Sequence, residues 1–384
     1  MELPPRAQDP TGAATRLDLP RRSILAGAVG LGAAAVLSGC GSDSPATTNP
    51  RSIVVKDQRG TTLKFDKPVR RIVTIPIPAA AIVMAVDQSA AHIVGMNDQS
   101  WTAVRDGIIS TIYPTALHIA HGVAAEDFSP NIESILALRP DVVVQWSSQG
   151  NGIITPLENA GLPVLGVDYG TLDDLEIWLT MFSTMLGKPE RGEAMNARTA
   201  TAQDAMVKEA ATRAGRPPRV LYFLRFADSM QVAGAETFNH EYIKLVGAEN
   251  AAAEITGGFG DVDIEQVLRW DPDIVLLGTF DAALPKDIYD DPVWKDVSAV
   301  RSRRVYKVPL GGYRWDPPSQ ETPLMWRWLA DIAFPTGAAS GLRTAITDDY
   351  GFLYRTAPTP TEIDDILWMD DNSASASYGQ FRAT

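Results

Sequence analysis

Residues 131–144 read NIESILALRPDVVV, and residues 263–276 repeat this stretch as DIEQVLRWDPDIVL. The two copies lie 132 positions apart and align without a gap. The six identical pairs are Ile132/Ile264, Glu133/Glu265, Leu136/Leu268, Pro140/Pro272, Asp141/Asp273 and Val143/Val275. This distance is too long for the period of a solenoid protein. The repeat therefore predicts two similar lobes, with a cleft between them.

Each copy predicts a short helix that leads into a buried strand. Asn131 and Asp263 are suitable N-caps, because a short side-chain oxygen can accept an otherwise unpaired helix N–H. Pro140 and Pro272 end the helices, since the residue before a proline avoids the helical region. The aliphatic runs that follow are typical of strands buried on both faces of a parallel sheet.

The start of the chain predicts export and lipid attachment. Arg21 and Arg22 precede an apolar stretch of 14 residues, 24–37, which is too short for a membrane span and fits the core of a signal peptide. Cys40 is the only cysteine, and small residues precede it. This pattern resembles a bacterial lipobox, which would place lipid on the Cys40 thiol and anchor the protein outside the cytoplasm at the cell membrane. A buried core cysteine is the alternative, and export by the twin-arginine or the general secretory route stays open.

The composition is that of a globular protein, and the length beyond the start of the chain suits two domains. The apolar share of the whole sequence is 45%, and its net charge of −13 argues against a nucleic-acid partner. Helical sequence from Pro189 to Arg213 predicts a rigid spacer between the lobes. The expected divisions are a signal peptide with lipobox (1–40), a flexible tether (41–52), an N-terminal α/β lobe (53–170), a connecting helical segment (171–215), a C-terminal α/β lobe (216–369) and a disordered tail (370–384).

Several stretches together carry a family resemblance. They are the opening VKDQRGTTLKFDKPVRRIVTI, the doubled motif, the long helix between the copies, VGAENAA (246–252), WRWLADIAFP (326–335) and YGFLYRTAPTPTEIDDIL (350–367). From about residue 52 to 369 the chain resembles the substrate-binding lipoproteins of ABC importers for iron chelates, cobalamin and haem. The resemblance implies a monomer of two Rossmann-like lobes joined by one long helix, with the ligand in the cleft.

The resemblance also implies that Glu133 and Glu265 dock onto the importer permease, one from each lobe. Two charged points far apart would fix the orientation on a membrane partner. The alternative is local, since a glutamate in the first helical turn is favoured by the helix dipole without any partner.

Ligand contacts are expected beyond the C-terminal ends of the strands, where open α/β sheets bind ligands. Arginines there suit anionic oxygens and aromatic rings provide flat apolar walls. The alternative for the tryptophans and the tyrosine is packing in the lobes. The candidates are Ile77, Pro78, Trp146, Arg225, Phe226, Met230, Tyr313, Arg314 and Trp315.

A ferric siderophore is the expected ligand, with haem and cobalamin as alternatives of the same family. We expect no intrinsic cofactor and no resident metal, although His240 and Tyr313 are weak candidates for completing an iron coordination sphere. An enzyme is not expected, because Cys40 is committed to lipid and the sequence has no G-x-S-x-G, Walker or H-E-x-x-H motif. Two hypotheses compete with this one: an exported hydrolase with an unrecognised site, and a chelate carrier without a permease.

Overall fold

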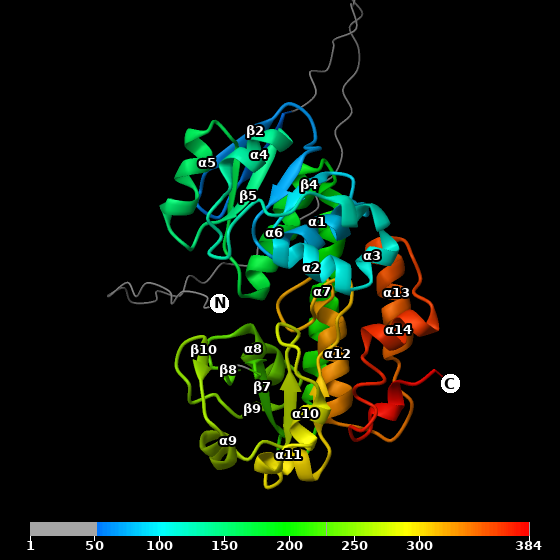
Figure 1. Cartoon of the computed structure of the whole chain (residues 1–384). Helices are drawn as coiled ribbons and strands as arrows, with labels where there is room; N and C mark the ends of the chain where they lie inside the picture. Colours follow the sequence, from blue (N-terminus) through cyan, green and yellow to red (C-terminus); the bar gives the residue numbers. More distant parts are fainter. Residues whose placement is uncertain (1–51, 228, 384) are drawn as a thin grey trace, which may run out of the picture.

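The computed structural model describes residues 52–227 and 229–383. It shows two α/β lobes, one above the other, joined by a long helix (Figure 1). The predicted signal peptide, Cys40 and nearly all of the predicted tether lie outside the described residues.

The N-terminal lobe is built on a parallel sheet of four strands in the order β4-β3-β5-β6. A separate antiparallel hairpin, β1–β2, precedes it, as the alternating sequence around Gly60 predicts. The elements in chain order are β1 (Ile53–Lys56), β2 (Thr62–Phe65), β3 (Ile72–Thr74), α1 (Ala79–Asp87), β4 (Ile93–Met96), α2 (Asp98–Asp106), α3 (Ile109–Ile112), η1 (Pro114–His118), α4 (Ile132–Leu138), β5 (Val142–Trp146), η2 (Asn151–Ile153), α5 (Thr155–Asn159) and β6 (Val164–Val167).

The C-terminal lobe has a six-stranded mixed sheet. Strands β7, β11 and β12 are parallel, with β12 at one edge. Strands β8 and β10 extend the sheet antiparallel beyond β7, and β9 also pairs with β7. Its elements are β7 (Arg219–Arg225), β8 (Gln231–Ala233), α8 (Phe238–Leu245), β9 (Glu249–Asn250), β10 (Phe259–Asp261), α9 (Ile264–Trp270), β11 (Ile274–Leu277), α10 (Pro285–Tyr289), η3 (Pro292–Trp294), α11 (Ser298–Arg301), β12 (Val305–Lys307), α12 (Thr322–Ala333), α13 (Leu342–Tyr354), α14 (Pro360–Ile366) and η4 (Tyr378–Phe381).

The two copies of the repeat form the same unit in both lobes. Asn131 accepts a hydrogen bond from the backbone N of Ser134 and so caps α4, and Asp263 caps α9 through Gln266. Each helix runs into a fully buried strand, β5 or β11. The predicted fold of two α/β lobes with parallel sheets is therefore confirmed.

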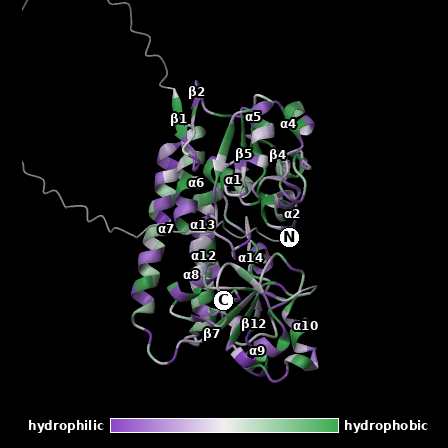
Figure 2. Ribbon diagram, turned by 90° about the vertical axis from the view of Figure 1, so that its left-hand side faces the viewer, coloured by the Kyte–Doolittle hydropathy of each residue, from purple (hydrophilic) through white to green (hydrophobic). Residues whose placement is uncertain are grey.

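Helices α6 (Leu172–Met185) and α7 (Pro189–Ala210) connect the lobes. The 22 residues of α7 span about 33 Å at 1.5 Å per residue. The helix ends three residues before the predicted Arg213, which instead donates to the backbone O of Val246. Figure 2 shows α7 as a largely hydrophilic helix along one side of the molecule, spanning both lobes.

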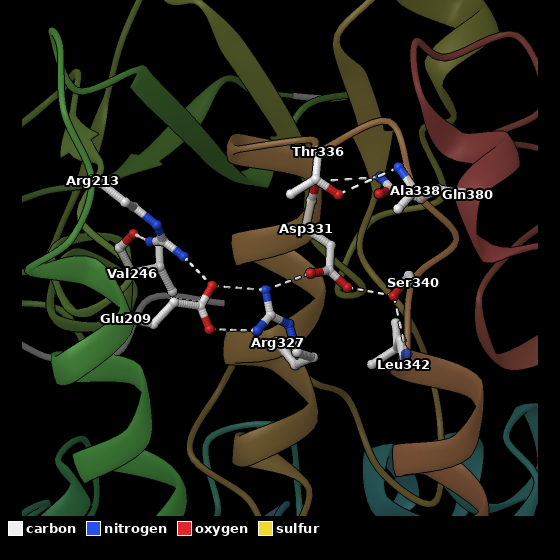
Figure 3. A network of polar contacts seen from close by, with 10 residues as sticks. All are labelled: Glu209, Arg213, Val246, Arg327, Asp331, Thr336, Ala338, Ser340, Leu342 and Gln380. Atoms are coloured by element: carbon white, nitrogen blue, oxygen red, sulfur yellow. Dashed lines mark hydrogen bonds and ion pairs between the residues drawn. The ribbon is translucent and has the colours of Figure 1, made fainter.

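A polar network braces α7 against the C-terminal lobe (Figure 3). Glu209 on α7 accepts from Arg213 at 2.7 Å and from Arg327 on α12 at 2.6 Å. Arg327 also pairs with Asp331 at 2.5 Å, whose other oxygen accepts from Ser340. Helix α7 is therefore fixed to α12 of the C-terminal lobe through a connected series of charged side chains.

Helix α13 runs back from the C-terminal lobe to contact the N-terminal lobe. Arg191, near the start of α7, donates to the backbone O of Phe352 at 2.8 Å, and Gln88 donates to the same atom at 3.0 Å. Arg198 donates from Nε to Asp349 at 2.6 Å. Helices α7 and α13, which are distant in the sequence, therefore both connect the lobes.

Two segments are more ordered than their sequences predict. The polar and aromatic sequence of residues 97–130 predicts loops, but this segment contains α2, α3 and η1. Residues 370–383, expected to be disordered, are packed: Tyr378 and Phe381 are buried, and Tyr378 donates to the backbone O of Leu367 at 2.5 Å. The segment is polar overall, so its composition predicts disorder, but its two aromatic side chains are enough to anchor it in the core. No helix in the described part of the chain is long and apolar enough to cross a membrane.

Candidate functional site

Residues 309–321 follow β12 and form a loop between the lobes, which we call the seam loop. The backbone N of Ile108 donates to the O of Gly311 at 3.3 Å, and the Tyr169 hydroxyl donates to the O of Pro318. Tyr313 packs against Ala81 and Ala103 of the N-terminal lobe. The C-terminal lobe therefore contacts the N-terminal lobe through the seam loop.

Tyr313 and Arg314 are buried on this loop, with 2% and 7% of their surfaces exposed. The guanidinium carbon of Arg314 lies 4.5 Å from the ring centroid of Phe280, and its Nε is 3.4 Å from the backbone O of Thr279. Burial raises the pKa of Tyr313 above its usual range, so this hydroxyl stays protonated. Both side chains can therefore donate hydrogen bonds.

Trp146 reaches the seam from the opposite lobe, at the C-terminal end of β5. Its ring lies 6.0 Å from Tyr169, whose hydroxyl bonds the seam loop, and 5.9 Å from Trp178. Trp146 and Trp178 are buried, and Tyr169 is partly buried. Trp146 is therefore joined to the seam loop through a single intervening side chain.

Four buried polar atoms at the seam have no hydrogen-bond partner among the residues that the structure describes. Three are donors: Nε1 of Trp146, the hydroxyl of Tyr313 and Nη1 of Arg314. The fourth, Oε1 of Gln320, is an acceptor. Buried polar groups are normally paired, and leaving one unpaired costs about 1–3 kcal/mol. Other buried atoms in this condition lie on β3, α7, α12 and elsewhere. At the seam, however, three of the four atoms can donate and these three come from both lobes, which favours an acceptor-rich ligand there.

Two buried carboxylates hold the seam loop, and sequence reasoning missed both. Asp316 accepts from the Tyr222 hydroxyl at 2.6 Å and from Thr279 at 2.6 and 2.9 Å. Several of their partners are distant in sequence, and the only local signal is that both acids lie in an aromatic segment.

The second carboxylate, Glu321, is fully buried under the loop. It accepts from Nε1 of Trp315 at 2.6 Å, from the backbone N of Gly312 at 2.9 Å, and from the hydroxyls of Tyr350 and Tyr354 at 3.1 and 2.5 Å. Burial raises the pKa of Glu321 to about 7, although these four donors favour the charged form. The acid therefore titrates near neutral pH.

The other predicted ligand residues take more varied positions. Trp315 has no exposed surface and gives its only donor to Glu321, so the structure places it beneath the seam. Pro78 is buried at the start of α1, while Ile77 packs against the Tyr313 cluster. The structure thus brings Ile77 but not Trp315 to the surface where the lobes meet.

The residues after β7 are held within the C-terminal lobe. Arg225 donates to the backbone O of Phe280, the residue on which Arg314 stacks. Phe226 packs on Trp294 with ring centroids 5.3 Å apart, and Met230 packs on the same core. Arg225 and Arg314 therefore flank one turn, whereas the two apolar side chains face their own lobe.

The metal candidates do not form a recognisable cation site. Within the described residues, no group of three or more His, Cys, Asp or Glu side chains could hold a metal ion. His240 lies on α8, where its Nδ1 is 3.4 Å from the amide of Asn250. Burial lowers the pKa of His240, and Lys244 lowers it further.

A recess of about 440 Å³ lies between the start of α6 and α8, beside α7. It borders the seam, because Asn239 donates both to the hydroxyl of Tyr242, which lines the recess, and to the backbone O of Asp316. Its lining is Leu172, Gln203, Phe238, His240, Glu241, Tyr242, Lys244, Leu245 and Trp326.

Comparisons with known proteins agree with this architecture. A model of the periplasmic binding protein family matches residues 123–310. A solved periplasmic solute binding protein from Veillonella parvula is 33% identical, covers 83% of this chain and 98% of its own, and superposes with a TM-score of 0.77.

Two curated relatives are more distant. The molybdate-binding protein MolA of Haemophilus influenzae is 24% identical over 60% of this chain and 72% of its own. The uncharacterised ABC transporter substrate-binding lipoprotein YvrC of Bacillus subtilis is 23% identical over 72% of this chain and 86% of its own.

Proposed function

Because this chain belongs to the periplasmic binding protein family, we propose that it captures an anionic, oxygen-rich solute at the seam and delivers it to an ABC importer. The family consists of binding proteins, so the role is binding and not catalysis. The chain is an extracytoplasmic substrate-binding protein that partners an ABC transporter permease.

The observation that carries the proposal is the set of unpartnered donors at the seam. Nε1 of Trp146 can only donate, and the guanidinium of Arg314 has donors and no acceptor. Tyr313 is buried and packs against Ala81 and Ala103 of the N-terminal lobe. A ligand that supplies oxygen acceptors would satisfy all three atoms, whereas an apolar or cationic ligand would leave them unpaired.

Within this class we propose a ferric siderophore, whose carboxylate or catecholate oxygens suit arginine. Arg225 and Arg314 both contact Phe280, so two guanidinium groups flank one turn after β11. Guanidinium groups bind such oxygens in a bidentate manner and stack on aromatic faces. Haem and cobalamin are the alternatives within the same family, and either would have to fit at the seam.

A small oxyanion such as molybdate is the second candidate, and the depth of the donors favours it. Tyr313 and Arg314 are almost fully buried, so an acceptor that reaches both must be compact or must insert a narrow group. MolA, a relative of this chain, is described as binding molybdate.

Calorimetric titration of the chain without residues 1–40 distinguishes these solutes. Ferric siderophores, haem, cobalamin, molybdate and bare Fe³⁺ or Ni²⁺ would be titrated separately. We expect saturable binding of one anionic solute, and clearly weaker binding in Arg314→Gln but not in the matched control Arg216→Gln, whose side chain is exposed. Tight binding of a bare metal cation, unaffected by Arg314→Gln, would contradict the proposal.

We also propose lipid attachment at Cys40 and permease docking through Glu133 and Glu265. YvrC, which is described as a lipoprotein, supports the first proposal. The second is supported by the exposure of both glutamates in the first turns of α4 and α9. The matching positions of these two helices in the two lobes would let one partner contact both.

A further inference from the structure

Two leucines are exposed at equivalent positions of the repeat. Leu136 on α4 is 44% exposed and Leu268 on α9 is 38% exposed. A single exposed leucine is ordinary in a soluble protein. Here the same residue is exposed twice, in two short helices whose neighbouring positions have diverged: Ser134 against Gln266 and Ala137 against Arg269.

The exposed leucine does not serve the packing of either helix. The buried face of each helix is provided by other residues, Ile135 in α4 and Val267 with Trp270 in α9. The pattern of exposure is also the same in both copies from the N-cap through the residue after the leucine. A polar residue would fill such a position without loss of core, so the leucine calls for a role outside the fold.

Each leucine lies one helical turn after a glutamate. Glu133 and Leu136, like Glu265 and Leu268, are three positions apart and therefore neighbours on one helix face. All four side chains are exposed. Each lobe thus presents a carboxylate beside an aliphatic group.

Both helices are attached to their sheets by the same contacts. Asp141 accepts from the backbone N of Arg71 at 2.9 Å, and Asp273 accepts from the backbone N of Arg219 at 2.8 Å. The side chain of Arg71 donates to the O of Leu138, and that of Arg219 donates to the O of Trp270, at the last turn of each helix. The two pairs of exposed residues are therefore held on rigid supports.

We infer that each lobe carries a two-residue docking point, Glu133 with Leu136 and Glu265 with Leu268, for an importer permease. This inference rests on the proposed function and adds an apolar half to the charged contact. The partner surface that fits it has a basic side chain beside an apolar pocket, and it presents this arrangement twice. The carboxylate would steer and orient the encounter, while burial of the leucine would lengthen the life of the complex.

The test measures binding of the full chain to its cognate ABC importer in lipid nanodiscs. We expect the double variant Leu136→Gln, Leu268→Gln to dissociate at least about tenfold faster, with little change in association rate or salt dependence. The double variant Glu133→Gln, Glu265→Gln should instead associate more slowly and lose its salt dependence. The matched control is Val293→Gln with Val207→Gln, two exposed aliphatic residues outside the repeat, which should bind as the wild type does.

Solute binding, read from tryptophan fluorescence, should be unchanged in every variant. If the leucine variant dissociates as slowly as the wild type while the glutamate variant is impaired, the apolar half of the docking point is wrong and the proposed function stands. If the wild-type protein binds solute but no importer, the proposed delivery itself is overturned.

Discussion

Nε1 of Trp315 donates a 2.6 Å hydrogen bond to Oε2 of Glu321, and both side chains are fully buried. The backbone N of Gly312 donates to the other oxygen of Glu321 at 2.9 Å. One carboxylate therefore holds the seam loop on both sides of Tyr313 and Arg314. The position of the proposed binding groups depends on a residue that need not touch the solute.

The raised pKa of Glu321 predicts a pH-dependent stability. Burial raises this pKa from 4.5 to about 7 in the folded protein, so the folded state keeps a proton that the unfolded state releases. The stability contributed by Glu321 is full below about pH 4.5, falls as pH rises towards 7 and is lost above it. Urea unfolding of the wild type and Glu321→Gln between pH 4.5 and 8 isolates this effect. The glutamine variant should be less stable than the wild type at low pH, and this difference in unfolding free energy should shrink as pH rises. A difference that does not change with pH would refute the role of Glu321.

The brace between α7 and α12 predicts a loss of stability when Arg327 is removed. Arg327→Met leaves Asp331, which is mostly buried, with only Ser340 as its partner, and leaves Glu209 with Arg213 alone. We expect the free energy of unfolding to fall by about 1–3 kcal/mol. The control Arg105→Gln removes an exposed pair with Asp106 and should cost clearly less stability, because solvent screens exposed ion pairs. Equal costs in urea unfolding would show that the brace is no stronger than a surface pair.

The double connection between the lobes predicts a small opening motion. Helix α7 spans both lobes, and α13 contacts α7 and α1 through Asp349 and the backbone of Phe352. Small-angle scattering should therefore give nearly the same radius of gyration with and without bound solute. A large decrease on binding would mean that these contacts break in the free protein.

Lipid attachment at Cys40 predicts a simple cellular phenotype. The wild-type protein should take up labelled fatty acid and sediment with membranes, because several acyl chains anchor a protein stably. Cys40→Ala should take up none and should appear in the soluble fraction. Membrane attachment of Cys40→Ala would point to an anchor elsewhere.

The repeat predicted the fold well because its local chemistry is sufficient. Asn131 and Asp263 cap helices, Pro140 and Pro272 follow their ends, and aliphatic runs form buried strands, all within the range of a few residues. These signals are independent of the rest of the chain. The arrangement of two lobes and a spacer helix could therefore be inferred before any long-range contact was known.

The interior of the site could not be predicted in the same way. Glu321 accepts hydrogen bonds from Tyr350 and Tyr354, about thirty residues later in the chain. Asp316, in the seam loop, accepts one from Tyr222 on β7. Such networks leave no periodic signal in the sequence. Residues 370–383 show the same limit, because their polar composition concealed Tyr378 and Phe381, which pack into the core.

The most direct test of the seam as the binding site is a comparison of solute affinity in three variants of its unpartnered donors. Tyr313→Phe and Trp146→Phe each remove one neutral donor and Arg314→Gln removes a charged one, while the folds should remain intact. For the solute identified by calorimetry, we expect affinity to fall about 3- to 10-fold for each neutral donor and about 10- to 100-fold for Arg314→Gln. Unchanged affinity in all three variants, with solute still bound saturably, would show that the solute binds elsewhere.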